Sequence, residues 1–281
     1  MYLYQNYMRL WREGLVNAGF SPRLPDVGIR YWLEQMERAI DTSKPKTFLD
    51  IGAGDGRLSL LMLRSGYLNG AAIEVQGNAK SWQAITDTYG SFHFYDGLLQ
   101  EHVAAMTRNQ KFDFVLLSEV FEHIPLPDVS AFLQALHAVL SDDGCVFLTT
   151  PNFDVQGPAE QSAVWHEREP YGHYKHYRYQ ELEALLKAHG FSMVWHAFEC
   201  HKFKSKLYNK WFYPLSRLDA KLLSSKKLPS AVRAIYRYLS APFISLVRGP
   251  LYGMACAVHQ VEKRWTDQQS GATMMMCIKK D

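Results

Sequence analysis

Cysteine is scarce in this chain of 281 residues, and none of its four cysteines stands in a C-x-x-C spacing. Their scatter argues against a disulfide framework and a zinc site, and it is typical of a reducing compartment. A long apolar run without charge is also missing, so we expect no transmembrane helix. The N-terminus has no basic region ahead of an apolar core, which argues against a secretory signal. We therefore expect no metal ligands and a cytoplasmic protein, soluble or peripheral at the inner face of the membrane.

Acidic residues are nearly absent from one part of the chain. Residues 201–248 contain 11 Lys and Arg against a single acid, Asp219, whereas residues 1–200 contain 16 Lys and Arg against 24 Asp and Glu. The two parts therefore carry net charges of +10 and −8, which suggests different partners. Hydrophobic residues make up 47% of the whole chain, enough for a large core.

The middle of the chain alternates short apolar runs with helical patterns. The runs are TFLDIG, AAIEV, SFHFYD, FDFVLLSEV, GCVFLTTPN and FSMVWHAFE, and a last run, TMMMCIKK, stands near the C-terminus. Continuous apolar runs, such as residues 114–117 and 146–148, are typical of a parallel sheet covered on both faces. Alternating strands and helices predict an α/β doubly wound sheet, to which the last run returns.

One helical pattern, DVSAFLQALHAVL, has apolar residues at three- and four-residue steps, which indicates one buried face. Gly144 follows it and is expected to end that helix.

Three glycines alternate directly behind the first apolar run, in FLDIGAGDGR. Glycine permits a positive φ and lets a ligand approach the backbone closely, and ligands of open parallel sheets bind beyond such strand ends. The spacing of Gly52, Gly54 and Gly56 is tighter than the G-x-G-x-x-G of dinucleotide-binding turns. This spacing argues against a nicotinamide dehydrogenase.

The next two runs also end in polar groups suited to an adenosine. Glu74 stands 22 residues after Gly52, where an acid can accept both ribose hydroxyls. Asp96 and Gly97 end the third run, and Asp96 could accept a hydrogen bond from an adenine amino group. Either acid alone could be an ordinary solvated residue. The ends of three successive runs, however, each offer a group that could contact an adenosine.

These motifs resemble the class I S-adenosylmethionine-dependent methyltransferases over roughly residues 45–200 and the last strand. FLDIGAGDG is similar to their first motif, FDFVLLSEVFEHIP to their fourth-strand motif and SDDGCVFLTTPN to the segment that follows. The resemblance implies a Rossmann-like seven-stranded sheet with an antiparallel last strand, and S-adenosylmethionine as cofactor. It implies that the cofactor contacts come from Asp50, Gly52, Gly54, Gly56, Glu74, Asp96, Gly97, Ser118 and Glu119.

Three histidines are candidates for a base that takes a proton from the acceptor. His123 stands in EVFEHIP, and His173 and His176 stand in YGHYKHYRY, a region that often lines the acceptor pocket in the resembled family. Each could instead be structural, and the spacing does not select one. Glu119 and Glu122 could flank the cofactor or the acceptor, or solvate the start of the next helix, a role that fits Glu122 better.

The sequence lacks motifs that are typical of methyltransferases acting on nucleic-acid bases or on protein arginine, and this narrows the class of acceptor. The chain has SEVF at residues 118–121 where base-methylating enzymes often carry an N-P-P-aromatic or D-P-P-aromatic tetrapeptide. The glutamates Glu119 and Glu122 are also closer together than the pair of the protein arginine methyltransferases. We therefore expect a small-molecule or carrier-linked acceptor, modified at a hydroxyl, such as a lipid-linked or saccharide envelope precursor. An RNA methyltransferase and a non-catalytic cofactor-binding protein are the alternatives.

The basic, aromatic stretch of residues 201–248 allows three interpretations. It could bind an anionic membrane surface, which we favour, or a nucleic acid, or it could be a solvated lid or dimerisation arm. Its prolines divide it into expected short helices. The predicted organisation is an N-terminal helical cap at 1–45, a cofactor-binding core at 46–200, a basic helical insertion at 201–270 and a closing strand at 271–281.

Overall fold

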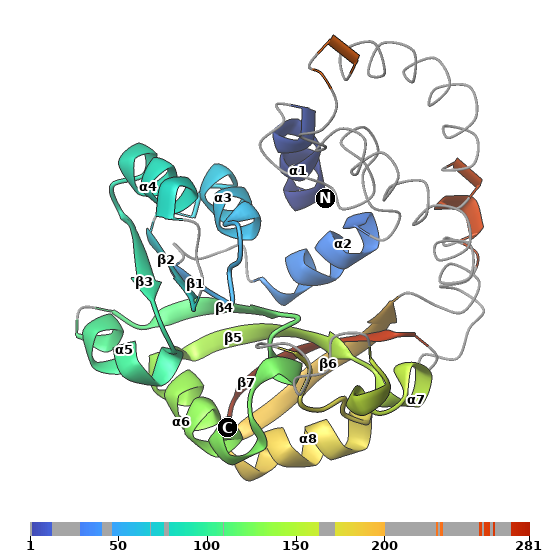
Figure 1. Cartoon of the computed structure of the whole chain (residues 1–281). Coiled ribbons are helices and arrows are strands. Elements are labelled where there is room, and N and C mark those ends of the chain that lie inside the picture. The colour runs from blue at the N-terminus through green and yellow to red at the C-terminus, as the bar shows by residue number, and fades with distance from the viewer. Residues whose placement is uncertain are drawn as a thin grey trace.

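The chain is described by a computed structural model (Figure 1). It describes residues 2–12, 29–40, 47–67, 69–75, 79–108, 110–162, 172–199 and 271–281, together with isolated positions between 229 and 261. The expected short helices of the basic insertion lie outside these residues, apart from those isolated positions.

Seven strands form one sheet in the order β3-β2-β1-β4-β5-β7-β6. All neighbours pair in parallel except β7, which runs antiparallel to both β5 and β6. This confirms the predicted Rossmann-like sheet and its antiparallel last strand. The strands are β1 Thr47–Ile51, β2 Asn69–Glu74, β3 Phe92–Asp96, β4 Phe112–Ser118, β5 Leu140–Pro151, β6 Phe191–Glu199 and β7 Thr273–Lys280.

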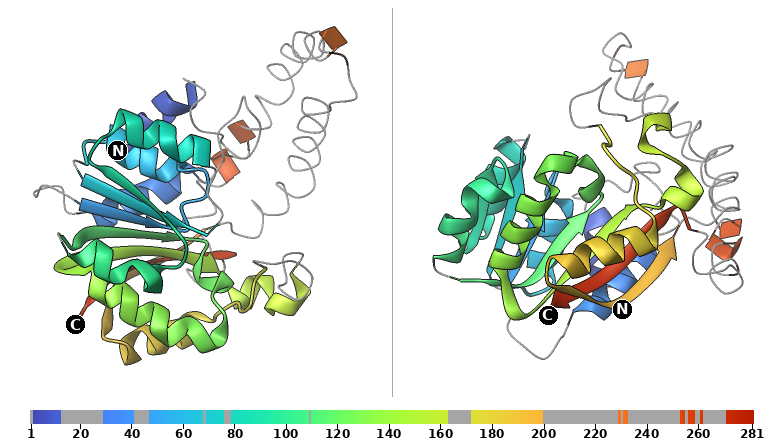
Figure 2. Two further views of the ribbon diagram at one scale, coloured as in Figure 1. Left: turned by 60° about the vertical axis from the view of Figure 1, so that its left-hand side comes forward. Right: turned by 90° about the horizontal axis from the view of Figure 1, so that it is seen from below.

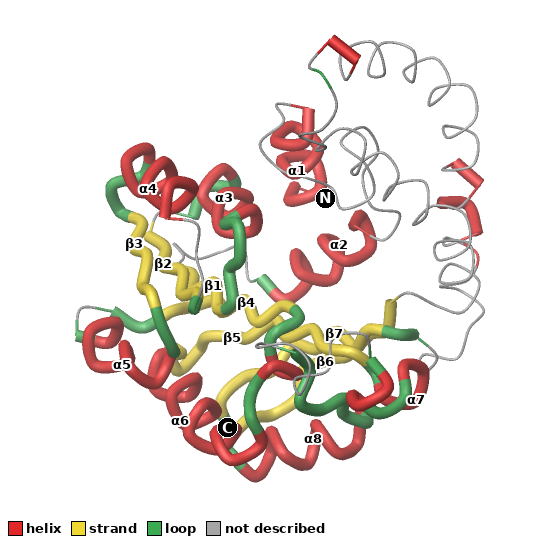
Figure 3. The backbone as a smooth tube through the Cα atoms, in the orientation of Figure 1, coloured by secondary structure: helices red, strands yellow, loops and turns green. Residues whose placement is uncertain are grey.

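Helices cover both faces of the sheet, so the fold has three layers (Figures 1 and 2). On one face lie α1 Tyr2–Arg12, α2 Ile29–Ala39, α3 Arg57–Arg64 and α4 Ala79–Thr88. On the other lie α5 Leu99–Thr107, α6 Val129–Val139 and α8 Tyr179–Ala188. The short helix α7 Phe153–Gln156 and the 3₁₀ turns Phe121–His123, Leu126–Asp128 and Ala159–Gln161 lie in the connections (Figure 3).

The apolar runs of the sequence explain this layering. Side chains alternate along a strand, and in β4 Val115 and Leu117 join the core under α6 and α8, whereas Phe114 and Leu116 join the core under α1 to α4. Both faces of the strand are thus buried, and each such side chain stabilises the fold by roughly 1.5–3 kcal/mol. No helix among the described residues is long and apolar enough to cross a membrane.

The expectation that Gly144 ends a helix was wrong. Helix α6 ends at Val139, and Gly144 lies inside β5, where the pairing with β4 shifts register between Phe112 and Phe114. A Cβ at this position would lie 2.9 Å from the carbonyl oxygen of Phe112. The glycine is explained by this close approach of two backbones at a bulge, which a local sequence pattern does not reveal.

Candidate active site

The carboxyl ends of the first four strands meet at one edge of the sheet. Ile51 of β1 pairs with Ile73 of β2 and with Leu117 of β4, and Glu74 pairs with Asp96 of β3. Residues that directly follow these strands are therefore close in space although they are far apart in sequence. This is the position at which open parallel sheets bind ligands.

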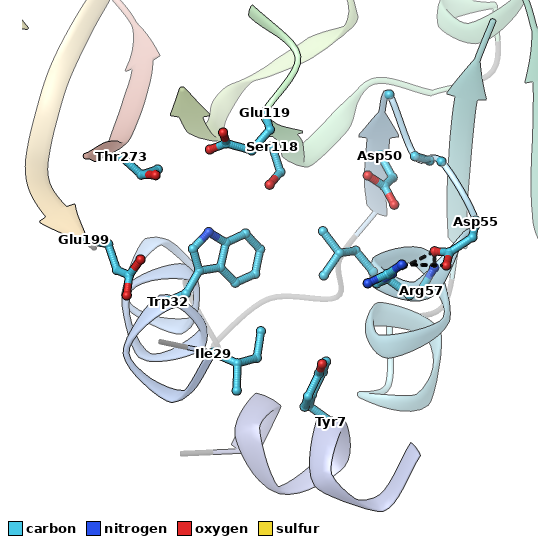
Figure 4. A pocket seen from close by; sticks show the side chains of 14 residues that line it. Tyr7, Ile29, Trp32, Asp50, Asp55, Arg57, Ser118, Glu119, Glu199 and Thr273 are labelled. Atoms are coloured by element: carbon cyan, nitrogen blue, oxygen red, sulfur yellow. Dashed lines mark hydrogen bonds and ion pairs between the residues drawn. The ribbon is translucent and has the colours of Figure 1, made fainter. Parts of the chain in front are cut away.

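A cavity of about 630 Å³ opens at this edge, within the size range of small-molecule sites (Figure 4). Tyr7 of α1 and Trp32 of α2 lie across it from Ser118 and Glu119. Its wall is formed by Tyr7, Ile29, Trp32, Asp50, Gly52, Ala53, Gly54, Asp55, Arg57, Leu58, Ser118, Glu119, Glu199 and Thr273.

The glycine turn adopts left-handed backbone at all three glycines, with φ of 68° at Gly52, 55° at Gly54 and 79° at Gly56. A Cβ on Gly52 would lie 2.3 Å from the Cγ2 atom of Val120, whereas a Cβ on Gly54 would meet nothing within 4 Å. Gly54 therefore keeps its stretch of backbone open. Its N–H donates to the Glu74 carboxylate over 2.7 Å, so the acid at the end of β2 lies against the turn.

Asp50 ends the first apolar run inside the protein, where 1% of its surface is exposed. Its Oδ2 atom accepts a hydrogen bond from the Ser59 hydroxyl of α3 over 2.7 Å. Burial raises the pKa of this carboxyl to about 7, because a charged form loses its hydration there. Asp50 thus ties the turn to α3 and also faces the cavity.

Glu119 follows β4 with a φ of 53° and is the one described non-glycine residue in left-handed backbone. Thr149 of β5 holds it there: the Glu119 N–H donates to the Thr149 carbonyl over 2.9 Å, and the Thr149 hydroxyl donates to Glu119 Oε1 over 3.0 Å. The residue is exposed to the cavity, yet its carboxyl group is surrounded by protein, and this desolvation raises its pKa to about 7.

We expected Glu122 to be a solvated residue at the start of a helix. This was wrong, because the residue is buried, with 1% of its surface exposed. Its Oε2 atom accepts from the Thr150 hydroxyl over 2.9 Å, and its Oε1 atom has no hydrogen-bond partner among the described residues. Burial, and then the charge of Glu119, raise its pKa well above the usual range. Neighbouring strand residues face opposite sides, so Thr149 and Thr150 hold the two glutamates on opposite sides of the end of β5.

The three candidate histidines lie together beside Glu122. The His123 and His173 rings meet edge to face with centroids 4.7 Å apart, and the Nδ1 atom of His173 is 2.7 Å from the Nε2 atom of His176. The loop that carries His173 is tied to the turn that carries His123, because the Tyr174 N–H donates to the Glu122 carbonyl over 2.7 Å. We call these three histidines and Glu122 the histidine cluster.

Hydrogen bonds assign the protons of the cluster. The carbonyl oxygens of Gly157 and Gly172 can only accept, so His176 and His123 carry protons on the Nδ1 atoms that face them. The Nε2 atom of His176 then accepts from His173. In the neutral form of the rings, lone pairs remain on Nε2 of His123 and of His173, whereas both nitrogens of His176 are engaged in hydrogen bonds. Burial, and then the other two rings, lower the pKa of His173 to about 4.

The structure thus separates the predicted residues into groups. Asp50, Gly52, Gly54, Ser118 and Glu119 line the cavity. Gly56 instead precedes α3, where a Cβ would lie 2.8 Å from the Cδ1 atom of Ile85. Asp96 and Gly97 lie beside Glu74 at the end of β3 and, like Glu74, do not form the cavity wall. His123, His173 and His176 form the cluster and do not line the cavity either.

Other residues of the cavity wall were not among the sequence candidates. Tyr7 and Trp32 come from helices remote in sequence, and no local motif marks them. Glu199 could have been found, because it ends the sixth apolar run as Asp50, Glu74 and Asp96 end the first three. With Asp50, Asp55, Glu119 and Glu199, four carboxyl groups line the cavity against one guanidinium, that of Arg57, which pairs with Asp55 over 2.8 Å.

Known proteins share this architecture. One is a SAM-dependent methyltransferase from Archaeoglobus fulgidus, with 15% identity, 92% of this chain and 95% of that chain covered, and a TM-score of 0.52. Another is a proposed sarcosine dimethylglycine methyltransferase from Galdieria sulphuraria, with 14% identity, 99% and 98% covered, and a TM-score of 0.58. The [4+2]-cyclase SpnF also matches, with 14% identity, 89% and 80% covered, and a TM-score of 0.52.

At this level of identity the similarity shows the fold, and the cyclase shows that the fold supports more than one reaction. The family comparison goes further, since residues 27–196 match a family model described as a methyltransferase domain. This range is more than half of the chain and contains the glycine turn, Glu119 and the histidine cluster. The chain therefore belongs to the methyltransferase-domain family and is a class I S-adenosylmethionine-dependent methyltransferase.

Proposed function

We propose that the protein transfers a methyl group to a hydroxyl of a small-molecule or carrier-linked acceptor, such as a lipid-linked or saccharide envelope precursor. The observation that carries the proposal is the cavity whose wall joins the glycine turn to Glu119. S-adenosylmethionine supplies, when bound, a methyl group already activated on a sulfonium. The protein mainly has to bind, align and exclude water.

The residues at the strand ends fit such a cofactor. The Gly54 backbone is open, because no atom lies within 4 Å of the place a Cβ would take. Glu74 lies against this turn and would accept the ribose hydroxyls, and Asp96 on the neighbouring strand would contact the adenine. The cavity is rich in carboxyl groups, which favour the positive charges of the sulfonium and the amino group. Ser118 and Glu119 would hold the methionine part.

The acceptor hydroxyl has to lose a proton as it attacks, and the histidine cluster would assist at this point. His123 and His173 each retain a lone pair on Nε2, whereas His176 only orients His173. Support comes from the two glutamates: Glu119 is in the cavity wall, and its charge is close enough to raise the pKa of Glu122 in the cluster. With an acceptor found by screening, we expect His173→Asn to lower kcat and leave cofactor binding unchanged. An unaltered kcat would exclude His173 from the reaction.

Calorimetric titration with S-adenosylhomocysteine tests the cofactor site. Wild type should bind in the micromolar range, and Glu74→Ala should weaken binding more than tenfold, or about 1.4 kcal/mol, because the ribose loses its acceptor. Asp87→Ala is the matched control, since it removes an exposed acid from α4. No binding by folded wild type would refute the proposal, and equal weakening by both variants would remove Glu74 from the site.

The proposal extends to the location of the acceptor. The basic stretch 201–248 would bring the site to an anionic membrane surface or a phosphate-bearing acceptor, a view supported by its sequence composition. Pelleting with anionic and neutral vesicles at low and moderate salt tests it. Salt-sensitive binding to the anionic vesicles is expected, and equal or no binding to the two kinds would contradict the membrane part alone.

A further inference from the structure

The histidine cluster contains a buried acceptor atom that the proposed proton transfer does not use. Oε1 of Glu122 has no hydrogen-bond partner among the described residues, although the side chain is 1% exposed. A carboxylate that is taken out of water without a partner is strongly unfavourable. The group must therefore take up a proton or lie next to a cation. The nearest nitrogen of His123, Nε2, is 3.9 Å away, which is too far for a hydrogen bond.

Two imidazole rings lie close to this carboxyl group. Glu122, His123 and His173 each offer a donor atom within 4.8 Å of the other two. The carbonyl oxygen of Gly172 fixes the proton of His123 on Nδ1, and His176 fixes that of His173 on Nδ1. The remaining lone pair of each ring is then on Nε2. Two imidazole nitrogens and a carboxylate oxygen, all hydrogen-bond acceptors, therefore lie close together without a donor between them. A proton on the carboxyl group or a metal cation between the three groups would relieve this arrangement, and the two lone pairs and the carboxylate together provide three ligands for a cation.

We propose that Glu122, His123 and His173 bind a divalent transition-metal ion such as zinc, manganese or iron. Two imidazoles and one carboxylate suit these ions, whereas magnesium and calcium prefer oxygen ligands. With bonds of about 2.1 Å, ligand atoms lie roughly 3–3.5 Å apart, so the three side chains would close in by about 1 Å.

The surrounding bonds are those that a metal site needs. A histidine that binds a metal through one nitrogen usually donates its other N–H to a carbonyl or a comparable acceptor, which fixes the ring. His123 donates to Gly172, and His173 donates to His176, which in turn donates to Gly157 over 2.8 Å. Thr150 holds the second oxygen of Glu122. The ligands are thus oriented before any ion binds, with His176 as a positioning residue.

The use of such an ion rests on the proposed function, although its binding does not. Three protein ligands leave positions open on the ion, and Glu119 in the cavity wall stands three residues before Glu122 in the chain. An ion there would act as a Lewis acid that makes an acceptor hydroxyl more acidic, in place of a free imidazole base. The scattered cysteines led us to expect no metal ligands. His123 and His173 are 50 residues apart in the sequence, so no short spacing marks them as a pair.

Cobalt(II), which reports its ligands in the visible spectrum, tests the site in the full chain after chelator treatment. Wild type should bind one equivalent with ligand-field bands that zinc(II) abolishes. Glu122→Gln and His173→Asn should each weaken binding at least tenfold, and His176→Asn about tenfold with a changed spectrum. His93→Asn, which alters an exposed histidine of β3, should match wild type. Circular dichroism confirms that each variant is folded.

The outcomes separate this inference from the proposed function. Wild type that binds S-adenosylhomocysteine but no cobalt, or binds cobalt equally after the Glu122→Gln and His173→Asn changes, overturns the metal site alone. Wild type that binds cobalt but no S-adenosylhomocysteine overturns the proposed function and leaves the metal site in place. An unchanged cobalt spectrum in His176→Asn would show that His176 does not position His173.

Discussion

The turns after β1 and β4 begin with the same unusual backbone but different residues. Gly52 has a φ of 68° and Glu119 a φ of 53°, and the strands before them pair side by side. At Gly52 a side chain is excluded, because Val120, which follows Glu119, fills the space that a Cβ would take. At Glu119 the left-handed backbone carries a side chain that reaches the cavity.

The difference shows how one left-handed backbone conformation serves two purposes. In the turn after β1, Gly52 has no side chain, and Val120 of the turn after β4 packs into the space that a side chain would take. The backbone at Gly54 stays open at the cavity. The second turn accepts strain of about 1–3 kcal/mol in order to present a carboxyl group, and Thr149 stabilises it. Strain of the kind found at Glu119 is concentrated at functional sites, and Glu119 is in the cavity wall.

The largest expected effect concerns the carboxyl on the β1 side. The pKa of Asp50 is raised from 3.8 to about 7, so its stabilising contribution is complete below pH 4 and is lost as the pH rises through 7. Between pH 4 and pH 8 wild type should lose about 4 kcal/mol of unfolding free energy that Asp50→Asn does not lose. Denaturant unfolding across this pH range measures it.

Ser59→Ala serves as the control for Asp50, since it removes the hydrogen bond and keeps the carboxyl. It should show a pH dependence at least as steep as that of wild type. Parallel curves for wild type and Asp50→Asn would mean that the carboxyl is not buried as described.

The next effect tests the contact between the two turns. Gly52→Ala should lower the free energy of unfolding by about 2–4 kcal/mol. The alanine would have to adopt left-handed backbone, and its methyl group would collide with Val120. Gly54→Ala, with open space around it, should cost only the backbone term of about 1–2 kcal/mol. Val120→Ala should recover part of the loss in the Gly52 variant and none in the Gly54 variant. Equal losses at both glycines would contradict the contact.

Local patterns predicted the strands, because the central apolar runs, such as that of β4, are buried on both faces and are recognised without knowledge of their partners. They also predicted the glycine turn and Glu74, which are joined by a hydrogen bond in the structure. The failures at Gly144 and Glu122 have one cause. In both, a partner strand decides the environment: β4 crowds Gly144, and β5 buries Glu122 with Thr150. Neither contact leaves a periodic signal.

The histidines illustrate the same limit at longer range. The sequence supplied His123, His173 and His176 as alternatives for one role, since spacing says nothing about which rings meet. Their arrangement depends on the bond from the Tyr174 N–H to the Glu122 carbonyl, across 52 residues of chain. That bond brings the three histidines into one cluster, whereas the sequence alone offered them as alternative candidates for the base.

The smallest expected effect is a difference in stability between two variants of Glu119. Its sign tests whether the backbone of this residue is left-handed. Replacing it by Ala or by Gly removes the same carboxyl and the same bond from Thr149, so the two variants differ only in backbone preference. With a φ of 53°, Glu119→Gly should be more stable than Glu119→Ala by about 1 kcal/mol, because alanine resists left-handed backbone. In ordinary strand backbone alanine would instead be favoured by about 0.5–1 kcal/mol. Urea unfolding of the two variants distinguishes the cases: greater stability of the alanine variant would show that the turn after β4 is not strained, and its likeness to the glycine turn would be lost.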